Sequence, residues 1–258
     1  MPKKIKISII TASFNSEAHI QSCLDSIAFQ TYENIEHVII DGKSTDKTLE
    51  IIDRHPFKPA KVISEKDKGI YDALNKGIKN ATGDIIGFLH SDDIFENEYV
   101  IEELVSAFEE SDSDLVYGNI LHVHQENTKK IYRTWNSLPF KKDLLKKGWM
   151  PPHNGLFVKR KIFLKHGTYD INFKISADYE WILRVFSKDS IEVLYMDKLI
   201  LRQRIGGKSN GSLLKIIQVM FEDYKALRSN QNRVVESVKI LIRKKLSKLD
   251  QFNLFSSK

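Results

Sequence analysis

The sequence has little of what stabilises secreted proteins or anchors membrane proteins. It contains one cysteine, Cys23, in 258 residues, which excludes an internal disulfide and favours a reducing compartment. No window approaches the roughly 20 apolar residues of a membrane-spanning helix. The apolar stretch near the amino terminus is broken by Ser13 and Asn15, so it is too short and too polar for a signal peptide. These absences predict a cytoplasmic protein, either free or peripheral on the cytoplasmic face of the membrane.

Two glycine-rich signatures for phosphate binding are also missing. A dinucleotide-binding fold carries Gly-x-Gly-x-x-Gly directly after its first strand, where the backbone must approach a pyrophosphate. Here the corresponding turn, 11–15, reads Thr-Ala-Ser-Phe-Asn, and the P-loop pattern is absent as well. A sugar-nucleotide nucleotidyltransferase, which we keep as an alternative, would place a loop rich in Gly, Arg and Lys at this turn. A phosphate ligand must therefore be bound by groups other than a glycine-rich loop.

The size and charge of the chain indicate one large domain with an anionic partner. The chain is 41% hydrophobic, which allows a sizeable core, and its net charge of +6 suits a nucleotide, a phospholipid surface or a nucleic acid. A non-catalytic nucleic-acid-binding protein is therefore a second alternative. Before residue 200, however, the basic residues are not interleaved with aromatics along one face, and the acids cluster at predicted strand ends. We therefore expect no nucleic-acid partner.

Strand and helix patterns alternate through the first half of the chain. Apolar and β-branched runs predict buried strands at 6–11, 35–40, 62–64 and 84–91, and helices are predicted between them at 16–30, 44–55 and 70–80. Such alternation is typical of an α/β fold with a mostly parallel sheet flanked by helices. Further on, the patterns predict a hairpin at 120–135, a helix at 178–187, a short strand at 191–195 and a flexible basic loop at 202–211.

Two adjacent acids, Asp92 and Asp93, follow the last of these apolar runs. The carboxyl ends of strands in open α/β sheets bind ligands, so the pair is a candidate site. Adjacent carboxylates repel each other unless donors or a cation compensate them. A hard ion such as Mn²⁺ or Mg²⁺, shared with phosphate oxygens, would do so. The same pair is also typical of a turn that caps the helix predicted from about residue 97.

Several ordered segments carry a resemblance to a known family. They are residues 8–15, 38–48, 67–77, 81–84 with 90–93, and 176–181. At these separations the chain resembles glycosyltransferase family 2, the inverting nucleotide-sugar enzymes with a GT-A fold, and in particular short bacterial enzymes that build surface polysaccharides. The likeness covers residues 5 to about 210. It implies a GT-A domain at 1–211, with a nucleotide-binding half at 1–119 and an acceptor-binding half at 120–211.

The resemblance also implies which residues bind the donor and the metal. Nucleotide-sugar binding is implied for Thr11, Ala12, Asn15, Asp41, Asp67, Asp92, Arg202 and Arg204. Thr11 and Ala12 would lie under the base through their backbone, and Asp41 would accept the N3–H of uracil. Asp92 and Asp93 would hold the cation, Mn²⁺ or Mg²⁺. Simpler alternatives remain: a helix cap for Asp41, a solvated turn for Asp67, and an unstructured basic loop for the arginines together with Lys208.

An inverting transfer also needs a base that removes the proton of the acceptor hydroxyl. The resemblance implies Asp178, at the start of a predicted helix, with Glu180 in reserve. Ala177 stands where relatives often carry another acid. Residues two positions apart do not share a helical face, so only one of these acids should enter the cleft. Asp178 could instead merely cap its helix. His153 and Asn154 match a position that relatives place near the acceptor.

Taken together, the resemblance implies transfer of a hexose from a UDP-sugar to a saccharide hydroxyl, with a lipid-linked acceptor in polysaccharide, O-antigen or capsule synthesis. The remaining segment, 212–258, is predicted as a helical, basic, amphipathic tail. Its apolar stripe consists of Val235, Val238, Ile242, Leu246 and Leu249, beside six basic residues between 233 and 248. Such a helix suits an anionic membrane surface. It equally suits packing on the domain or on a second subunit in a homodimer.

Overall fold

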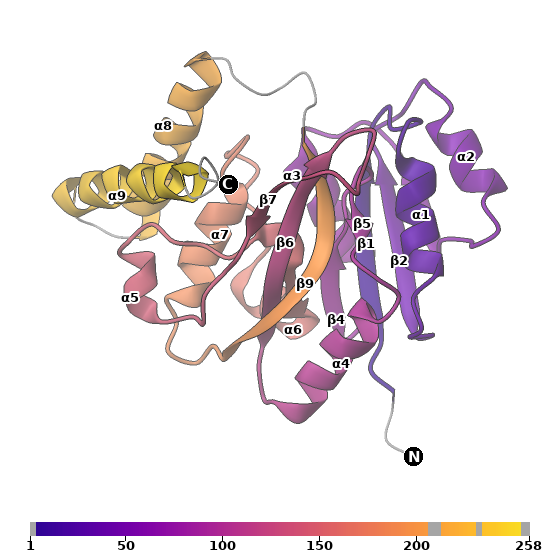
Figure 1. Cartoon of the computed structure of the whole chain (residues 1–258), viewed down its shortest axis with the longest axis horizontal. Coiled ribbons are helices and arrows are strands. Elements are labelled where there is room, and N and C mark those ends of the chain that lie inside the picture. Colours follow the sequence, from indigo (N-terminus) through magenta and orange to yellow (C-terminus); the bar gives the residue numbers. More distant parts are fainter. Residues whose placement is uncertain (1–3, 206–212, 231–233, 254–258) are drawn as a thin grey trace.

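The computed structural model describes residues 4–205, 213–230 and 234–253. Nine strands in this part of the chain form one sheet in the order β3-β2-β1-β4-β8-β6-β9-β5, with β7 paired to β6 (Figure 1). Their bounds are β1 Ile7–Ser13, β2 Ile35–Asp41, β3 Lys61–Ser64, β4 Ile85–Phe88, β5 Ile94–Phe95, β6 Leu115–His124, β7 Ile131–Trp135, β8 Leu156–Lys159 and β9 Val193–Ile205. The predicted α/β class with a mixed, helix-flanked sheet is confirmed.

The amino-terminal half is the parallel part of the sheet. β1 pairs in parallel with β2 and with β4, and β2 pairs in parallel with β3. Helices α1 (Ile20–Ala28), α2 (Thr48–Arg54) and α3 (Ile70–Asn80) connect these strands. Because parallel strands end at the same edge, the residues that follow β1, β2 and β4 gather there. The register places Ser13 opposite Asp41 at this edge.

The carboxyl-terminal half extends the sheet with strands of both directions. β8 lies antiparallel between β4 and β6, β9 runs parallel to β6, and β6 with β7 forms the predicted hairpin. The helices of this half, together with one short 3-10 helix η1, are α4 Val100–Glu110, α5 Lys142–Leu145, η1 His153–Gly155, α6 Arg160–His166, α7 Ala177–Phe186, α8 Leu213–Asn230 and α9 Val234–Asn253. Figure 1 shows α7, α8 and α9 together, on the side of the sheet away from α1 and α2.

The prediction of a flexible basic loop at 202–211 is wrong for residues 202–205. Residues 202–205 belong to β9, which is one 13-residue strand rather than the short strand expected at 191–195. The strand continues because β6 pairs with it as far as Ile205 and β5 pairs with it at Leu201 and Arg202. The arginines of β9 fit in the strand because their side chains donate hydrogen bonds to the Glu96 carboxylate and to the backbone carbonyls of Thr128 and Gln125. Lys208 lies outside the described residues.

The first helix also begins later than its sequence suggests. α1 starts at Ile20 rather than near Ser16, and Ser16 does not cap it with its side chain. The Ser16 hydroxyl lies 2.8 Å from that of Ser91, in the loop that follows β4. This contact joins the turn after β1 to the loop that carries the two acids. The Ser16 carbonyl accepts the amides of His19 and Ile20, so the chain makes one turn before α1, while the Ser16 side chain belongs to the sheet edge.

Candidate functional site

Asp41 lies at the end of β2, fully buried, and four hydrogen bonds reach its carboxylate. The hydroxyls of Ser13 and Ser44 donate to Oδ1, while the Ser44 amide and the Ser64 hydroxyl donate to Oδ2, at 2.9 and 2.7 Å. A carboxylate offers about four acceptor positions, so all are occupied. Asp41 thus joins the ends of β1, β2 and β3. A ligand N–H could reach it only by displacing a serine hydroxyl, and the Ser13 bond, at 3.1 Å, is the longest.

The side chains of Asp67 and Phe14 lie close to the backbone of Gly42, the residue after Asp41. A Cβ atom at Gly42 would lie 2.7 Å from Oδ2 of Asp67 and 3.2 Å from the ring of Phe14, so these side chains crowd the backbone there. The Phe14 side chain is 62% exposed. The structure therefore places Asp67 beside Gly42, the residue that follows Asp41. It adds Phe14 as an exposed aromatic surface that the sequence reading missed, although a large aromatic directly after a strand was a usable signal.

Three other predicted donor-side residues, Thr11, Ala12 and Asn15, make contacts within the protein. Thr11 is fully buried in β1, where its hydroxyl donates to the Leu89 carbonyl and contacts His37, so the structure does not expose it to a nucleobase. Ala12 is partly buried against the core. Asn15, with a positive φ of 47°, accepts from the Thr45 amide at 2.9 Å. Its side chain therefore fixes the turn after β2.

The two adjacent acids have different surroundings. Asp93 is fully buried, and its Oδ2 accepts from the Asn154 amide at 2.8 Å. Its Oδ1 is buried without a partner. Burial and the neighbouring charge of Asp92 raise the pKa of Asp93 well above its usual range. Asp92 is exposed. An unpartnered buried acceptor beside a second carboxylate is a place that a cation can occupy.

A metal at this position would draw few ligands from the protein. Among the described residues, no group of three histidine, cysteine or acidic side chains is placed to hold a metal ion. Asp93 and Asp92 therefore fit a cation that takes one or two carboxylate oxygens and completes its shell with phosphate oxygens and water. Mg²⁺ and Mn²⁺ bind nucleotides in this way.

The two arginines of β9 are placed differently from expectation. Arg202 donates to both oxygens of Glu96, at 2.9 and 2.8 Å, and is not free to cover a diphosphate. It joins β9 to the segment after β5. Arg204 donates to the backbone oxygens of Asp92 and Gln125 and lies beside the acidic pair. Of the two, only Arg204 is brought to the site.

Asp178 lies in the first turn of α7, buried, and two side chains hold it. The Tyr71 hydroxyl donates to Oδ1 at 2.9 Å, and Nδ1 of His153 lies 3.3 Å from Oδ2. Burial and the charge of Asp178 raise the pKa of the Tyr71 hydroxyl, so this group remains a proton donor. The sequence reading missed Tyr71, although it lies inside one of the quoted segments. Asp178 is therefore an oriented carboxylate with two fixed partners.

The short helix η1 connects the acidic pair with this carboxylate. Its consecutive residues His153 and Asn154 reach Asp178 and Asp93 respectively. The His153 ring also lies 5.8 Å, between ring centroids, from that of His90, in the loop before the acids. Burial and the nearby His153 lower the pKa of His90 to about 4, so His90 is neutral near pH 7. One short segment thus joins a candidate metal position to a candidate base.

Comparison with known proteins decides the family. The family model for glycosyl transferase family 2 matches residues 8–167. A PGL/p-HBAD biosynthesis glycosyltransferase of Mycobacterium bovis is 33% identical over 208 residues, which covers 79% of this chain and 78% of that protein. The chain belongs to glycosyltransferase family 2. It is therefore an enzyme that transfers a sugar.

Solved structures share the fold of this glycosyltransferase at low identity. S. aureus TarS 1–349, in complex with UDP-GlcNAc, aligns with a TM-score of 0.71 at 18% identity, covering 98% of this chain and 76% of that one. The mannosyltransferase PcManGT from Pyrobaculum calidifontis, in complex with GDP-Man and Mn²⁺, aligns with a TM-score of 0.63 at 15% identity, covering 100% and 77%. These alignments confirm the GT-A type of fold.

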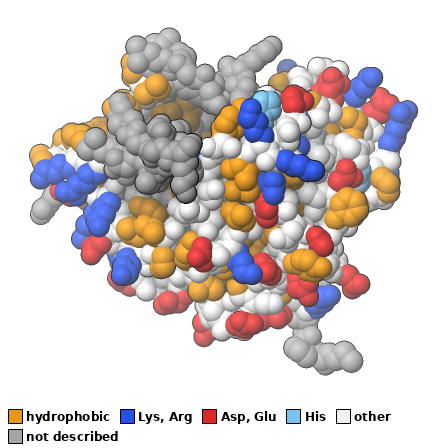
Figure 2. All heavy atoms as spheres, viewed as in Figure 1, with side chains coloured by type: hydrophobic (Ala, Val, Ile, Leu, Met, Phe, Trp, Pro, Cys, Tyr) orange, Lys and Arg blue, Asp and Glu red, His pale blue; other side chains and the backbone are white. Residues whose placement is uncertain are grey.

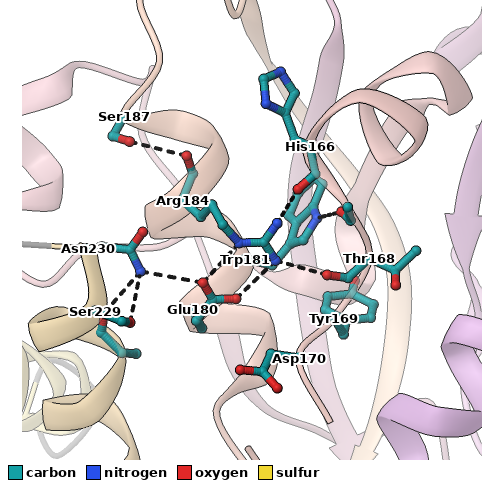
Figure 3. Close-up of polar contacts among 12 residues, drawn as sticks. His166, Thr168, Tyr169, Asp170, Glu180, Trp181, Arg184, Ser187, Ser229 and Asn230 are labelled. Atoms are coloured by element: carbon teal, nitrogen blue, oxygen red, sulfur yellow. Dashed lines mark hydrogen bonds and ion pairs between the residues drawn. The ribbon is translucent and has the colours of Figure 1, made fainter. Parts of the chain in front are cut away.

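Within the glycosyltransferase, Glu180 points away from the candidate base. Figure 3 shows its carboxylate between Arg184 and Asn230, on the side of α7 that faces α8. Arg184 donates to both oxygens, at 2.9 and 3.0 Å, and also to the Thr168 carbonyl. Glu180 therefore holds α7 to its neighbours, and the structure does not bring it to the acceptor side. The expectation that only one of the two acids faces the cleft agrees with this placement.

Proposed function

We propose that this glycosyltransferase moves a hexose from a UDP-sugar to a hydroxyl of a saccharide acceptor by single displacement with inversion. The observation that carries the proposal is η1, in which His153 contacts the buried acid Asp178 and Asn154 contacts the buried acid Asp93. One acid can hold the leaving group through a cation while the other receives a proton. Two such tasks, on opposite sides of the reacting carbon, are what inversion requires.

In this mechanism Asp178 accepts the proton of the acceptor hydroxyl as its oxygen attacks the anomeric carbon. Tyr71 and His153 hold the carboxylate so that one of its lone pairs faces the acceptor. Asp93 and Asp92 would hold Mn²⁺ or Mg²⁺. When bound, that ion neutralises the charge that develops on the departing nucleoside diphosphate. Arg204, beside Asp92, adds positive charge on the same side.

The preference of the enzyme for one nucleobase in the donor provides a first test. If Asp41 reads the N3–H of uracil, UDP with Mn²⁺ should bind at least about 10-fold more tightly than CDP, because cytosine lacks that donor. Asp41→Asn should reduce the preference to within about threefold. Isothermal titration with both nucleotides measures this.

A melting curve of the unliganded variant provides the control, since Asp41 also joins three strands. Equal binding of UDP and CDP by the unaltered protein would contradict the proposed donor class. Stabilisation by a DNA or RNA oligonucleotide instead of UDP would favour the nucleic-acid-binding alternative.

The two last described helices carry an exposed apolar face. Its members are Ile216, Ile217, Met220, Phe221, Val234, Val235, Val238 and Ile242. Three of them, Val235, Val238 and Ile242, belong to the predicted stripe, whereas the side chains of Leu246 and Leu249 lie outside the described part. Exposed Lys239 and Arg243 flank this face. Figure 2 shows hydrophobic and basic side chains together on this side of the molecule.

We propose that this face, which we call the α8–α9 face, rests on an anionic membrane surface and presents the enzyme to a lipid-linked acceptor on the cytoplasmic side. Apolar burial and basic residues near anionic lipid act together in such binding. In the described part of the chain, no helix is both long and apolar enough to cross a bilayer. The alternative is that a second copy covers the α8–α9 face in a homodimer.

Substitutions on the α8–α9 face test its partner. Val235→Glu with Ile242→Glu should abolish cosedimentation with anionic vesicles, because both side chains are exposed and would carry charge into the interface. UDP binding should stay unchanged. Binding by the unaltered protein should weaken as salt rises.

Leu164→Glu is a matched control, since Leu164 is an exposed leucine on another helix. An unaltered protein that ignores anionic vesicles would contradict the membrane proposal. A dimer that the double substitution dissociates would support the homodimer instead. Substitution is preferable to removing α9, because Lys244 forms a buried ion pair with Asp223.

A further inference from the structure

Glu222, on α8, binds the turn that leads into α7. Its Oε2 accepts the amides of three consecutive residues, Lys174, Ile175 and Ser176, at 2.9, 2.8 and 3.1 Å. Glu222 is buried. Three amides directed at one anionic oxygen form a concave backbone site of the kind that binds anions. Here a side chain of the protein's own α8 occupies that site.

The turn that Glu222 holds is the one that places Asp178. Ser176 precedes α7, and Asp178 is the second residue of that helix. On the other side of the turn, the Tyr71 hydroxyl lies within hydrogen-bond distance of two acceptors, the Ile175 carbonyl and the Asp178 carboxylate, which share its one proton. The peptide groups around Ile175 are therefore held between α8 and α3. A displacement of this turn would move the carboxylate relative to Tyr71 and His153.

The next residue of α8 has a separate task. Asp223 is buried and forms an ion pair with Lys244 of α9 at 2.8 Å, and the Lys244 ammonium lies over the ring of Tyr179. This pair joins α8 to α9 and to α7, whereas the three amides of the turn at 174–176 donate to Glu222. The two adjacent buried acids therefore have different partners. Asp223 joins α8 to α9, and Glu222 binds the backbone that precedes Asp178.

We propose that Glu222 is a positioning residue for the reaction, which fixes Asp178 through the backbone of residues 174–176. The inference rests on the proposed function, in which Asp178 is the base. α8 is then part of the catalytic centre rather than an appendage to it. A shift of about 1 Å in a reacting group can cost about 10²-fold in rate, so the contribution is large enough to measure.

Glu222→Ala tests this inference. We expect kcat to fall about 10- to 100-fold, while the KM for the donor changes less than about threefold, because the donor side does not touch this turn. Glu222→Gln, which keeps one oxygen acceptor, should restore most of the rate. Hydrogen exchange of the amides at 174–176 should be faster in Glu222→Ala than in the unaltered protein.

Asp223→Asn is the matched control. It removes the charge of the neighbouring buried acid, so it should lower the melting temperature. Below that temperature it should leave kcat and exchange at 174–176 close to those of the unaltered protein. A kcat loss as large as that of Glu222→Ala would overturn the inference, because general loosening of α8 would then explain both variants.

A double variant separates positioning from general damage. On an Asp178→Asn background, Glu222→Ala should cause little further loss, because no base remains to be positioned. An equal fold loss in both backgrounds, or an unchanged kcat in Glu222→Ala alone, would overturn the inference. Full activity of Asp178→Asn by itself would instead overturn the base assignment, and that result needs no change at Glu222.

Discussion

Asp178→Asn is expected to lower kcat by roughly 10²- to 10⁴-fold while UDP affinity stays near that of the unaltered enzyme. The substitution preserves size and can still accept from Tyr71, but it removes the proton affinity of the carboxylate. Because Asp178 lies in α7 and the candidate metal position lies after β4, the donor side should be unaffected. Turnover measured as UDP release, with nucleotide binding by titration, gives both quantities.

Glu180→Gln is the matched control for that experiment, since Glu180 lies in the same helix and faces α8. Loss of its full charge weakens the contact with Arg184, so the melting temperature should fall while kcat remains within about threefold. If Glu180→Gln abolished turnover and Asp178→Asn did not, the base would be misassigned. The anomeric configuration of the product, read by NMR, should be inverted relative to the donor, and retention would falsify single displacement.

Removal of divalent metal is expected to abolish activity, and Asp93→Ala is expected to reduce both turnover and nucleotide affinity. The physical reason is that Oδ1 of Asp93 is a buried acceptor without a partner, next to the carboxylate of Asp92. A cation held there would bind the diphosphate, so loss of the acid removes the metal and part of the nucleotide site together. Activity assays with EDTA, followed by addition of Mn²⁺ or Mg²⁺, measure the first effect.

Nucleotide titration in the presence and absence of Mn²⁺ measures the second effect. UDP binding by the unaltered enzyme should strengthen when Mn²⁺ is added, whereas binding by Asp93→Ala should respond little. Asp67→Ala is a useful comparison, since Asp67 lies near Asp41 on the nucleoside side and its loss should leave the Mn²⁺ response intact. Full activity in chelator would rule out the metal role of the acidic pair.

The parts of the fold set by local pattern could be predicted from the sequence. The strands β1 and β2 and the helix α3 follow from hydrophobic periodicity and from the residues at their ends. Acids at strand ends could be predicted as a site for the same reason, because parallel strands end at one edge. The ordered segments of residues 8–93 and 176–181 then identified the family, which the comparisons confirm.

The predictions that were wrong, or that were not made, concern residues whose partners lie far away in the chain. Arg202 looked like part of a free basic loop, yet Glu96, 106 residues earlier, neutralises it and lets β9 continue. The helix predicted from residue 16 begins only at Ile20, and the Ser16 hydroxyl instead lies within hydrogen-bond distance of that of Ser91, 75 residues later. The sequence carries no signal for Glu222, since an acid in an amphipathic helix is ordinary until the turn at 174–176 folds beside it. Local pattern cannot report such contacts.

Phe221 and Glu222 are adjacent in α8 but lie on different faces of the helix, about 100° apart. Phe221 is 67% exposed on the α8–α9 face, whereas Glu222 is buried against the turn before the base. If the α8–α9 face rests on a membrane as proposed, immobilising Phe221 would also restrain Glu222 and, through the turn at 174–176, Asp178. Docking would then reinforce an alignment of Asp178 that Tyr71, His153 and Glu222 already hold in the free protein, and docking and catalysis would share the entropy cost of ordering this turn.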